Sequence, residues 1–80
     1  MHELSLAQDM LAIVEAAARK HGATRVASVR LDLGDAACVE PEALAFAFEV
    51  VAREGCASGA RLDIERIPGH AMRVRDIEIA

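Results

Sequence analysis

The chain of 80 residues contains no tryptophan and no tyrosine, and its two phenylalanines are Phe46 and Phe48. Hydrophobic residues still make up 54% of the sequence, so the core has to be built mainly from Ala, Val, Leu and Ile side chains. A chain of this length buries only roughly 60–65% of the surface that it exposes when unfolded, which leaves room for a single core. We therefore predict one domain spanning residues 1–80.

Clusters of positive charge are also missing. Nine Lys and Arg residues stand against thirteen Asp and Glu residues, and the net charge is −4. This composition lacks the basic surface that nucleic-acid binding requires, so we expect no nucleic-acid partner. No apolar run reaches the roughly 18 residues of a membrane span, and the first residues do not resemble a secretion signal, so we expect a cytoplasmic protein with no membrane partner.

Paired cysteines and catalytic motifs are missing too. Cys38 and Cys56 stand alone, with no Cys-x-x-Cys pair, and we interpret both as reduced packing residues, although the sequence leaves a bridge between them open. The sequence shows no Ser-His-Asp arrangement, no phosphate-binding Gly-rich loop and no catalytic Cys-His pair. We therefore predict that the chain is not an enzyme.

Two helices are predicted from apolar residues spaced three and four apart. The first runs from about Leu6 to His21, after a capping box of Ser5 and Gln8, with Gly22 suited to its C-terminal cap. The second runs from Pro41 to about Glu54 and is apolar over more than half its circumference, so it should be the more buried helix. The residues before the first helix, Met1–Leu4, could form a short additional strand.

Three strands are predicted from alternating apolar residues. The first begins near Arg25, places Ala27, Val29, Leu31 and Leu33 on one face, and ends at Gly34. The second covers Ala60–Glu65, and the third starts at Met72. Only the segment 68–71 separates the last two, which predicts an antiparallel hairpin.

The third strand changes phase, because Met72 and Val74 are followed by Ile77 and Ile79, and we predict a β-bulge near Arg75 and Asp76. The expected fold is α+β, with two helices packed on one face of a small three-stranded sheet whose last two strands form a hairpin. The other face of the sheet should be solvated or offered to a partner. Its expected side chains are Arg30, Asp32, Arg61, Asp63, Glu65, Arg73 and Arg75.

The start of the chain, Met1-His2, contains a candidate metal chelate. The terminal amine, the amide nitrogen of His2 and its imidazole Nδ1 can close a five-membered and a six-membered ring around one ion, and Ni(II) and Cu(II) favour such a planar nitrogen field. The alternative is that His2 merely belongs to a frayed terminus. His70 could add a ligand or be solvated, and His21 suits the negative end of a helix dipole. Glu40 and Glu42, which flank Pro41, are interpreted as helix-capping residues.

Four segments of the chain, 1–6, 20–26, 39–49 and 73–79, have a distinctive combination of residues. Together they resemble the HypA family of hydrogenase maturation factors. The resemblance implies a nickel metallochaperone that helps to insert nickel into the large subunit of [NiFe]-hydrogenase together with the maturation GTPase HypB. It also implies that Met1, His2 and Glu3 bind the nickel, through the terminal amine, backbone amides and the His2 imidazole, and that the loop around Glu40 approaches the same site.

The chain departs from this family at one place. HypA proteins carry a zinc-binding segment with two Cys-x-x-Cys pairs between their last two strands, and here that segment is absent between about 68 and 72, so we expect no zinc. An engineered deletion and a natural short homologue would both give this join. A short join also favours a domain-swapped dimer. The alternative function is a truncated interaction scaffold that docks on HypB without delivering metal.

Overall fold

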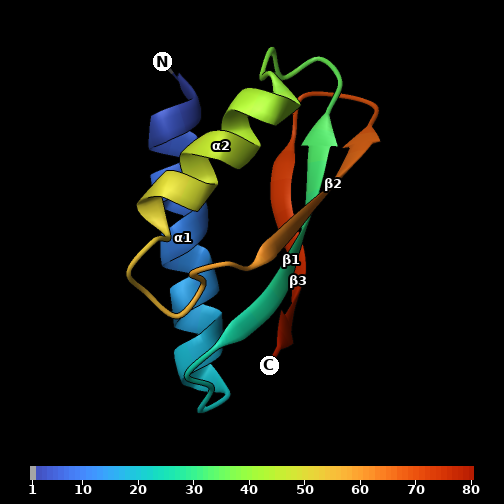
Figure 1. Ribbon diagram of the computed structural model, residues 1–80. Coiled ribbons are helices and arrows are strands. Elements are labelled where there is room, and N and C mark those ends of the chain that lie inside the picture. The colour runs from blue at the N-terminus through green and yellow to red at the C-terminus, as the bar shows by residue number, and fades with distance from the viewer. Residues whose placement is uncertain (1) are drawn as a thin grey trace.

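The structure is a computed structural model that describes residues 2–80, so Met1 lies outside the described residues (Figure 1). Two helices cover one face of a three-stranded sheet, which confirms the predicted α+β class and its layers. Among residues 2–80, neither helix combines the length and apolar character that crossing a membrane requires. The elements in chain order are α1 (His2–Lys20), β1 (Val26–Gly34), α2 (Pro41–Val51), β2 (Arg61–Ile67) and β3 (Met72–Ile79).

The order of the strands in the sheet differs from the predicted pairing of the last two strands as a hairpin. The sheet runs β2-β1-β3, with β1 parallel to β2 and antiparallel to β3. β2 and β3 do follow each other through a short connection and run in opposite directions, as expected. Within residues 2–80, however, β1 lies between them and they do not pair. β1 takes the centre because it is the most deeply buried strand, and a central strand has both of its edges paired.

The connection between β2 and β3 crosses over the end of β1 (Figure 1). The Gly34 amide donates to the Ala71 carbonyl at 2.7 Å, and the Asp35 amide donates to the Ile67 carbonyl at 2.7 Å. The Asp35 side chain in turn accepts a hydrogen bond from the Gly69 amide at 3.2 Å. The short connection is therefore held by β1 and the turn that follows it.

Both helices differ from prediction at one end. α1 begins at His2, so Ser5 and Gln8 lie inside the helix rather than capping it, and residues 2–4 form no strand. An acidic Glu3 in the first turn favours this earlier start, because negative charge is stabilised at a helix N-terminus. The other end agrees with prediction, since Gly22 has φ +65°.

α2 ends at Val51, with Ala52 as its C-cap, rather than near Glu54. The chain turns back here so that the Cys56 carbonyl can accept a hydrogen bond from the Val26 amide at 2.9 Å. α2 nevertheless leaves apolar side chains outside the core, since Phe46 is 66% exposed and Val50 is exposed as well. The core is formed by one stripe of α1, by β1, by two side chains of α2 and by the loops before and after α2. Its members are Ala7, Met10, Val14, Ala18, Val26, Val29, Leu31, Leu33, Val39, Leu44, Phe48, Ala52 and Ala57.

The predicted β-bulge is confirmed. Arg30 pairs with Asp76 while Leu31 pairs with Val74, so Arg75 is the additional residue on β3. A second register shift occurs near the start of β1, between Val26 and Ser28. It buries Val26 and exposes residue 27, so the expectation that Ala27 faces the core is wrong.

The open face of the sheet carries a network of ion pairs. Arg75 reaches across β1 and contacts Asp32 at 2.7 Å and Glu65 at 2.8 Å, while Arg73 contacts Asp32 at 3.3 Å. Asp32 is buried beneath the two guanidinium groups. Hydrogen bonds and charge attraction from Arg75, followed by Arg73, hold the pKa of the Asp32 carboxyl below its usual range. The bulge at Arg75 thus links all three strands.

Acid should weaken this fold partly through Asp32. Because its pKa is lower in the folded chain, its stabilising contribution is complete above the unfolded value of about 3.9 and is lost as pH falls through the folded value. We expect the urea midpoint of the wild-type chain to fall more steeply below about pH 4 than that of the Asp32→Asn variant. Equal slopes for the two proteins would contradict this assignment.

Candidate metal site at the start of the first helix

His2 and Glu3 lie in the first turn of α1, and the His2 side chain is exposed. The first four amide groups of an α-helix have no carbonyl partner within the helix. The amide nitrogens of His2 and Glu3 are therefore not tied into the helical hydrogen-bond ladder. A metal ion could reach these nitrogens without breaking the helix.

Glu3 connects the start of α1 to the loop before α2. The pKa of its carboxyl is lowered, and hydrogen bonds from the backbone amides of Glu3 and Glu40 are among the causes. Glu40 is the N-cap of α2, where its side chain accepts a hydrogen bond from the Glu42 amide at 3.3 Å. The hydrogen bond to the Glu42 amide confirms the capping role predicted for Glu40. The contact between the Glu40 amide and the Glu3 carboxyl places the N-terminal ends of the two helices next to each other.

The electrostatic potential at the start of α1 favours metal ions that bind deprotonated amide nitrogens. The N-terminus of a helix carries a partial positive charge, which disfavours an unmodified cation. A metal that displaces an amide proton leaves a negatively charged nitrogen, and the same helix dipole stabilises that charge. Ni(II) and Cu(II) suit such nitrogen ligation, whereas Mg²⁺ and Ca²⁺ prefer oxygen ligands.

Side chains alone do not form a metal site in the described part of the chain. Residues 2–80 contain no group of three or more His, Cys, Asp or Glu side chains arranged to hold an ion. His21 follows the far end of α1, whose 19 residues span about 28 Å, so it cannot share an ion with His2. His70 is exposed in the β2–β3 connection. The assignment of Met1, His2 and Glu3 as ligands stays a prediction, and Met1 lies outside the described residues.

Neither cysteine within residues 2–80 is bridged. Cys56 is partly buried against the core, in agreement with a packing role. Cys38 is exposed and has φ +58°, so the packing role predicted for it is wrong. The turn that leads into α2 places this side chain outside the core.

An apolar patch beside Glu3 was not predicted. Leu4 on α1 and Phe46 and Val50 on α2 are all exposed, and together with Glu3 and Ala47 they line one surface pocket. The signal was present in the sequence, because a helix that is apolar over more than half its circumference cannot bury every apolar side chain against one layer. We call Leu4, Phe46 and Val50 the N-terminal apolar patch.

Comparisons with known proteins agree with these features. A family model described as hydrogenase/urease nickel incorporation, metallochaperone, hypA matches residues 1–74. The hydrogenase maturation factor HypA of Azoarcus sp. (strain BH72) is 54% identical over 69 residues, which cover 86% of this chain and 60% of that protein. HypA of Albidiferax ferrireducens is 48% identical over 71 residues, which cover 89% of this chain and 63% of that protein.

The chain thus spans about 60% of the length of the curated relatives that it matches. Among solved structures, the nickel metallochaperone HypA from Helicobacter pylori superposes with a TM-score of 0.86 at 20% identity and covers 96% of both chains, which supports the fold. The extent of the family match and the identity to the relatives decide the family. The chain belongs to the HypA family of hydrogenase and urease nickel-incorporation proteins.

Proposed function

We propose that this chain is a nickel-binding metallochaperone domain that takes part in inserting nickel into [NiFe]-hydrogenase. The observation that supports this site is that α1 begins at His2. The amide nitrogens of His2 and Glu3 therefore make no hydrogen bonds within the helix. The terminal amine of Met1, the amide and imidazole of His2 and the amide of Glu3 would hold the ion. Nickel is cargo here, so its binding has to be reversible. The chain supplies a carrier rather than a catalytic centre.

The proposed partners follow from the family. They are a HypB-like maturation GTPase and the precursor of the [NiFe]-hydrogenase large subunit. The N-terminal apolar patch borders Glu3, so a partner that covers it would come close to the nickel. We expect no zinc, because the chain has no Cys-x-x-Cys pair. A domain-swapped dimer through the short β2–β3 connection stays a prediction.

The alternative is a scaffold that docks on the GTPase without delivering metal. Such a scaffold would have no need of the proposed nickel ligands, whereas the Met1-His2-Glu3 sequence is intact. The description of the matched family also concerns nickel incorporation. We therefore favour the metallochaperone.

A calorimetric titration with Ni(II) tests this proposal directly. We expect the untagged chain to bind one ion with an absorption band typical of planar nickel. A form with two additional residues before Met1 loses the terminal amine as a ligand and should bind far more weakly. Equal binding by the two forms would show that the ion lies elsewhere.

Nickel affinity should also depend on pH. The imidazole and the terminal amine bind metal only when deprotonated, and their reference pKa values are about 6.5 and about 8. Protons therefore compete with nickel increasingly as pH falls, and affinity should drop by at least about tenfold between pH 8 and pH 6. The same titration at three pH values measures this effect, and a constant affinity would argue against nitrogen ligands.

A further inference from the structure

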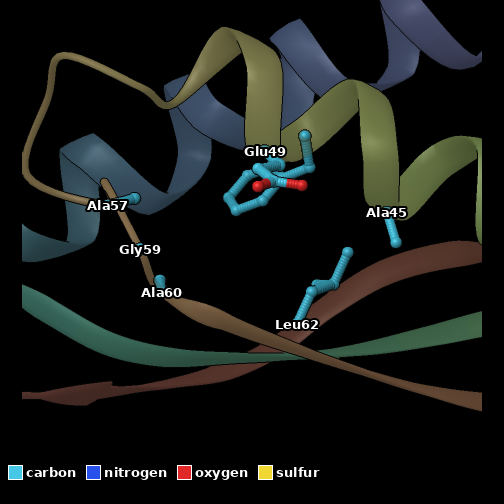
Figure 2. A pocket seen from close by; sticks show the side chains of 7 residues that line it. Ala45, Glu49, Ala57, Gly59, Ala60 and Leu62 are labelled. Carbon is cyan, nitrogen blue, oxygen red and sulfur yellow. The ribbon is translucent and has the colours of Figure 1, made fainter.

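A second surface, on the opposite side of α2 from the N-terminal apolar patch, has a shape and chemistry of its own. A pocket of about 240 Å³ opens between α2 and β2, and we call it the α2–β2 groove. Figure 2 shows Ala45 and Glu49 on α2 facing Leu62 on β2 across this groove. Its lining residues are Ala45, Phe48, Glu49, Ala57, Gly59, Ala60 and Leu62.

Small side chains explain why the groove exists. Four of its seven lining residues are Ala or Gly, and α1 packs closely on α2 and β3 whereas α2 packs less closely on β2. As a result Leu62 remains partly exposed on the helix side of the sheet. The groove is therefore apolar in its depth, with the exposed Glu49 as the charged group among its lining residues.

β2 forms one wall of the groove and is also an edge strand. Within residues 2–80 it pairs with β1 alone, so the backbone groups on its outer edge are available to another strand. An extended peptide added to this edge would direct every second side chain towards α2 and into the groove. The remaining side chains would point to the open face of the sheet.

The size and charge of the groove indicate what kind of molecule it can bind. A volume of about 240 Å³ is below the roughly 300–1,000 Å³ of small-molecule sites and suits one or two apolar side chains. α2 contributes Glu42 and Glu49 and contains no Lys or Arg. A second copy of this chain, with its net charge of −4, would be repelled, whereas a basic segment would be attracted.

We propose that the α2–β2 groove binds an extended, basic and apolar peptide segment of a partner protein, which adds as a fourth strand to the edge of β2. An apolar side chain of the peptide fills the space beside Leu62, and a Lys or Arg two residues away, on the same face of the peptide strand, pairs with Glu49. This inference does not depend on nickel binding, because the groove lies apart from His2 and Glu3.

The probe is an acetylated and amidated peptide with the sequence Thr-Lys-Thr-Leu-Thr-Lys-Thr, whose Lys and Leu side chains share one face of the strand. It is titrated into the ¹⁵N-labelled chain and followed by NMR. We expect the largest shift changes at Leu62, Ile64 and Ala45, together with slower amide exchange in β2. A peptide with Asp in place of each Lys, and one with N-methyl groups on its Lys and Leu residues, should bind at least about tenfold more weakly. Absence of binding at millimolar peptide, or shifts centred on Phe46, would overturn the proposal.

Protein variants separate the groove from general surface charge. Glu49→Lys should weaken binding of the Lys peptide at least about fivefold and improve binding of the Asp peptide. Glu54→Lys makes the same charge change at an exposed residue outside the groove and should have little effect. Ala45→Phe should block the groove, with its fold checked by circular dichroism. Equal effects of Glu49→Lys and Glu54→Lys, or self-association through β2, would contradict the proposed occupant.

Discussion

Replacing His2 by alanine is expected to lower the affinity of the untagged chain for Ni(II) by about 100-fold or more. The substitution keeps the amide nitrogen at position 2 but removes the imidazole, and with it the six-membered chelate ring. Loss of a group that merely orients a metal ligand commonly costs 10–100-fold in affinity, so loss of a direct ligand should cost at least the upper end of that range. Calorimetric titration of both proteins at pH 8 measures the difference.

His21→Ala is the matched control for this experiment. It removes an imidazole beyond the opposite end of α1, so nickel affinity should remain at the wild-type value. His2 and His21 are both exposed, and neither substitution should alter the thermal unfolding curve. If the His2→Ala variant bound nickel with wild-type affinity, or if both variants lost affinity equally, His2 would not be a nickel ligand.

The start of α1 shows how far local sequence signals reach. Ser5 and Gln8 have the spacing of a capping box, and that signal predicted a helix that begins four residues too late. The helix begins at His2 instead, with the acidic Glu3 in its first turn, where negative charge is favoured. The assignment of Met1, His2 and Glu3 as ligands stays a prediction, and the sequence signals did not predict that the backbone of His2 and Glu3 is helical.

The order of the strands shows the same limit at a larger scale. The phase change in β3 located the bulge at Arg75, because side-chain alternation is a local property. Chain proximity also predicted that β2 and β3 would pair, and this was wrong. Pairing depends on which strand can pair along both of its edges, and β1 does so with residues 33 to 53 positions away in the sequence.

The apolar surface of α2 was only half predicted. Its sequence showed that the helix is apolar over most of its circumference, and we inferred deep burial. In the structure Phe48 enters the core while Phe46 is exposed, because a two-layer fold covers one side of each helix. The uncovered side of α2 forms part of the N-terminal apolar patch. The α2–β2 groove exists because the residues that face β2 are small. Both surfaces arise from having more apolar residues than one small core can cover.

Gly34→Ala is expected to destabilise the fold by about 3 kcal/mol or more, because the added methyl group meets backbone rather than a movable side chain. A Cβ at this position would lie 2.2 Å from the Gly69 carbonyl oxygen and 2.9 Å from the Ala71 amide nitrogen. The β2–β3 connection would have to move away from β1 and give up the Gly34–Ala71 hydrogen bond. For a domain of this size, such a loss corresponds to a fall of roughly 12–24 °C in the melting temperature.

Gly55→Ala provides the comparison, because a Cβ there meets only the end of the flexible Glu15 side chain, at 3.2 Å. The melting temperature of this variant should therefore stay within a few degrees of the wild type. Measuring both variants by calorimetry separates the crossing at Gly34 from the general effect of replacing glycine. If Gly34→Ala unfolded at the wild-type temperature, the connection would not be held against the end of β1. A loosened connection would in turn leave β2 and β3 free to exchange between chains, so sizing of Gly34→Ala should show more dimer than the wild type.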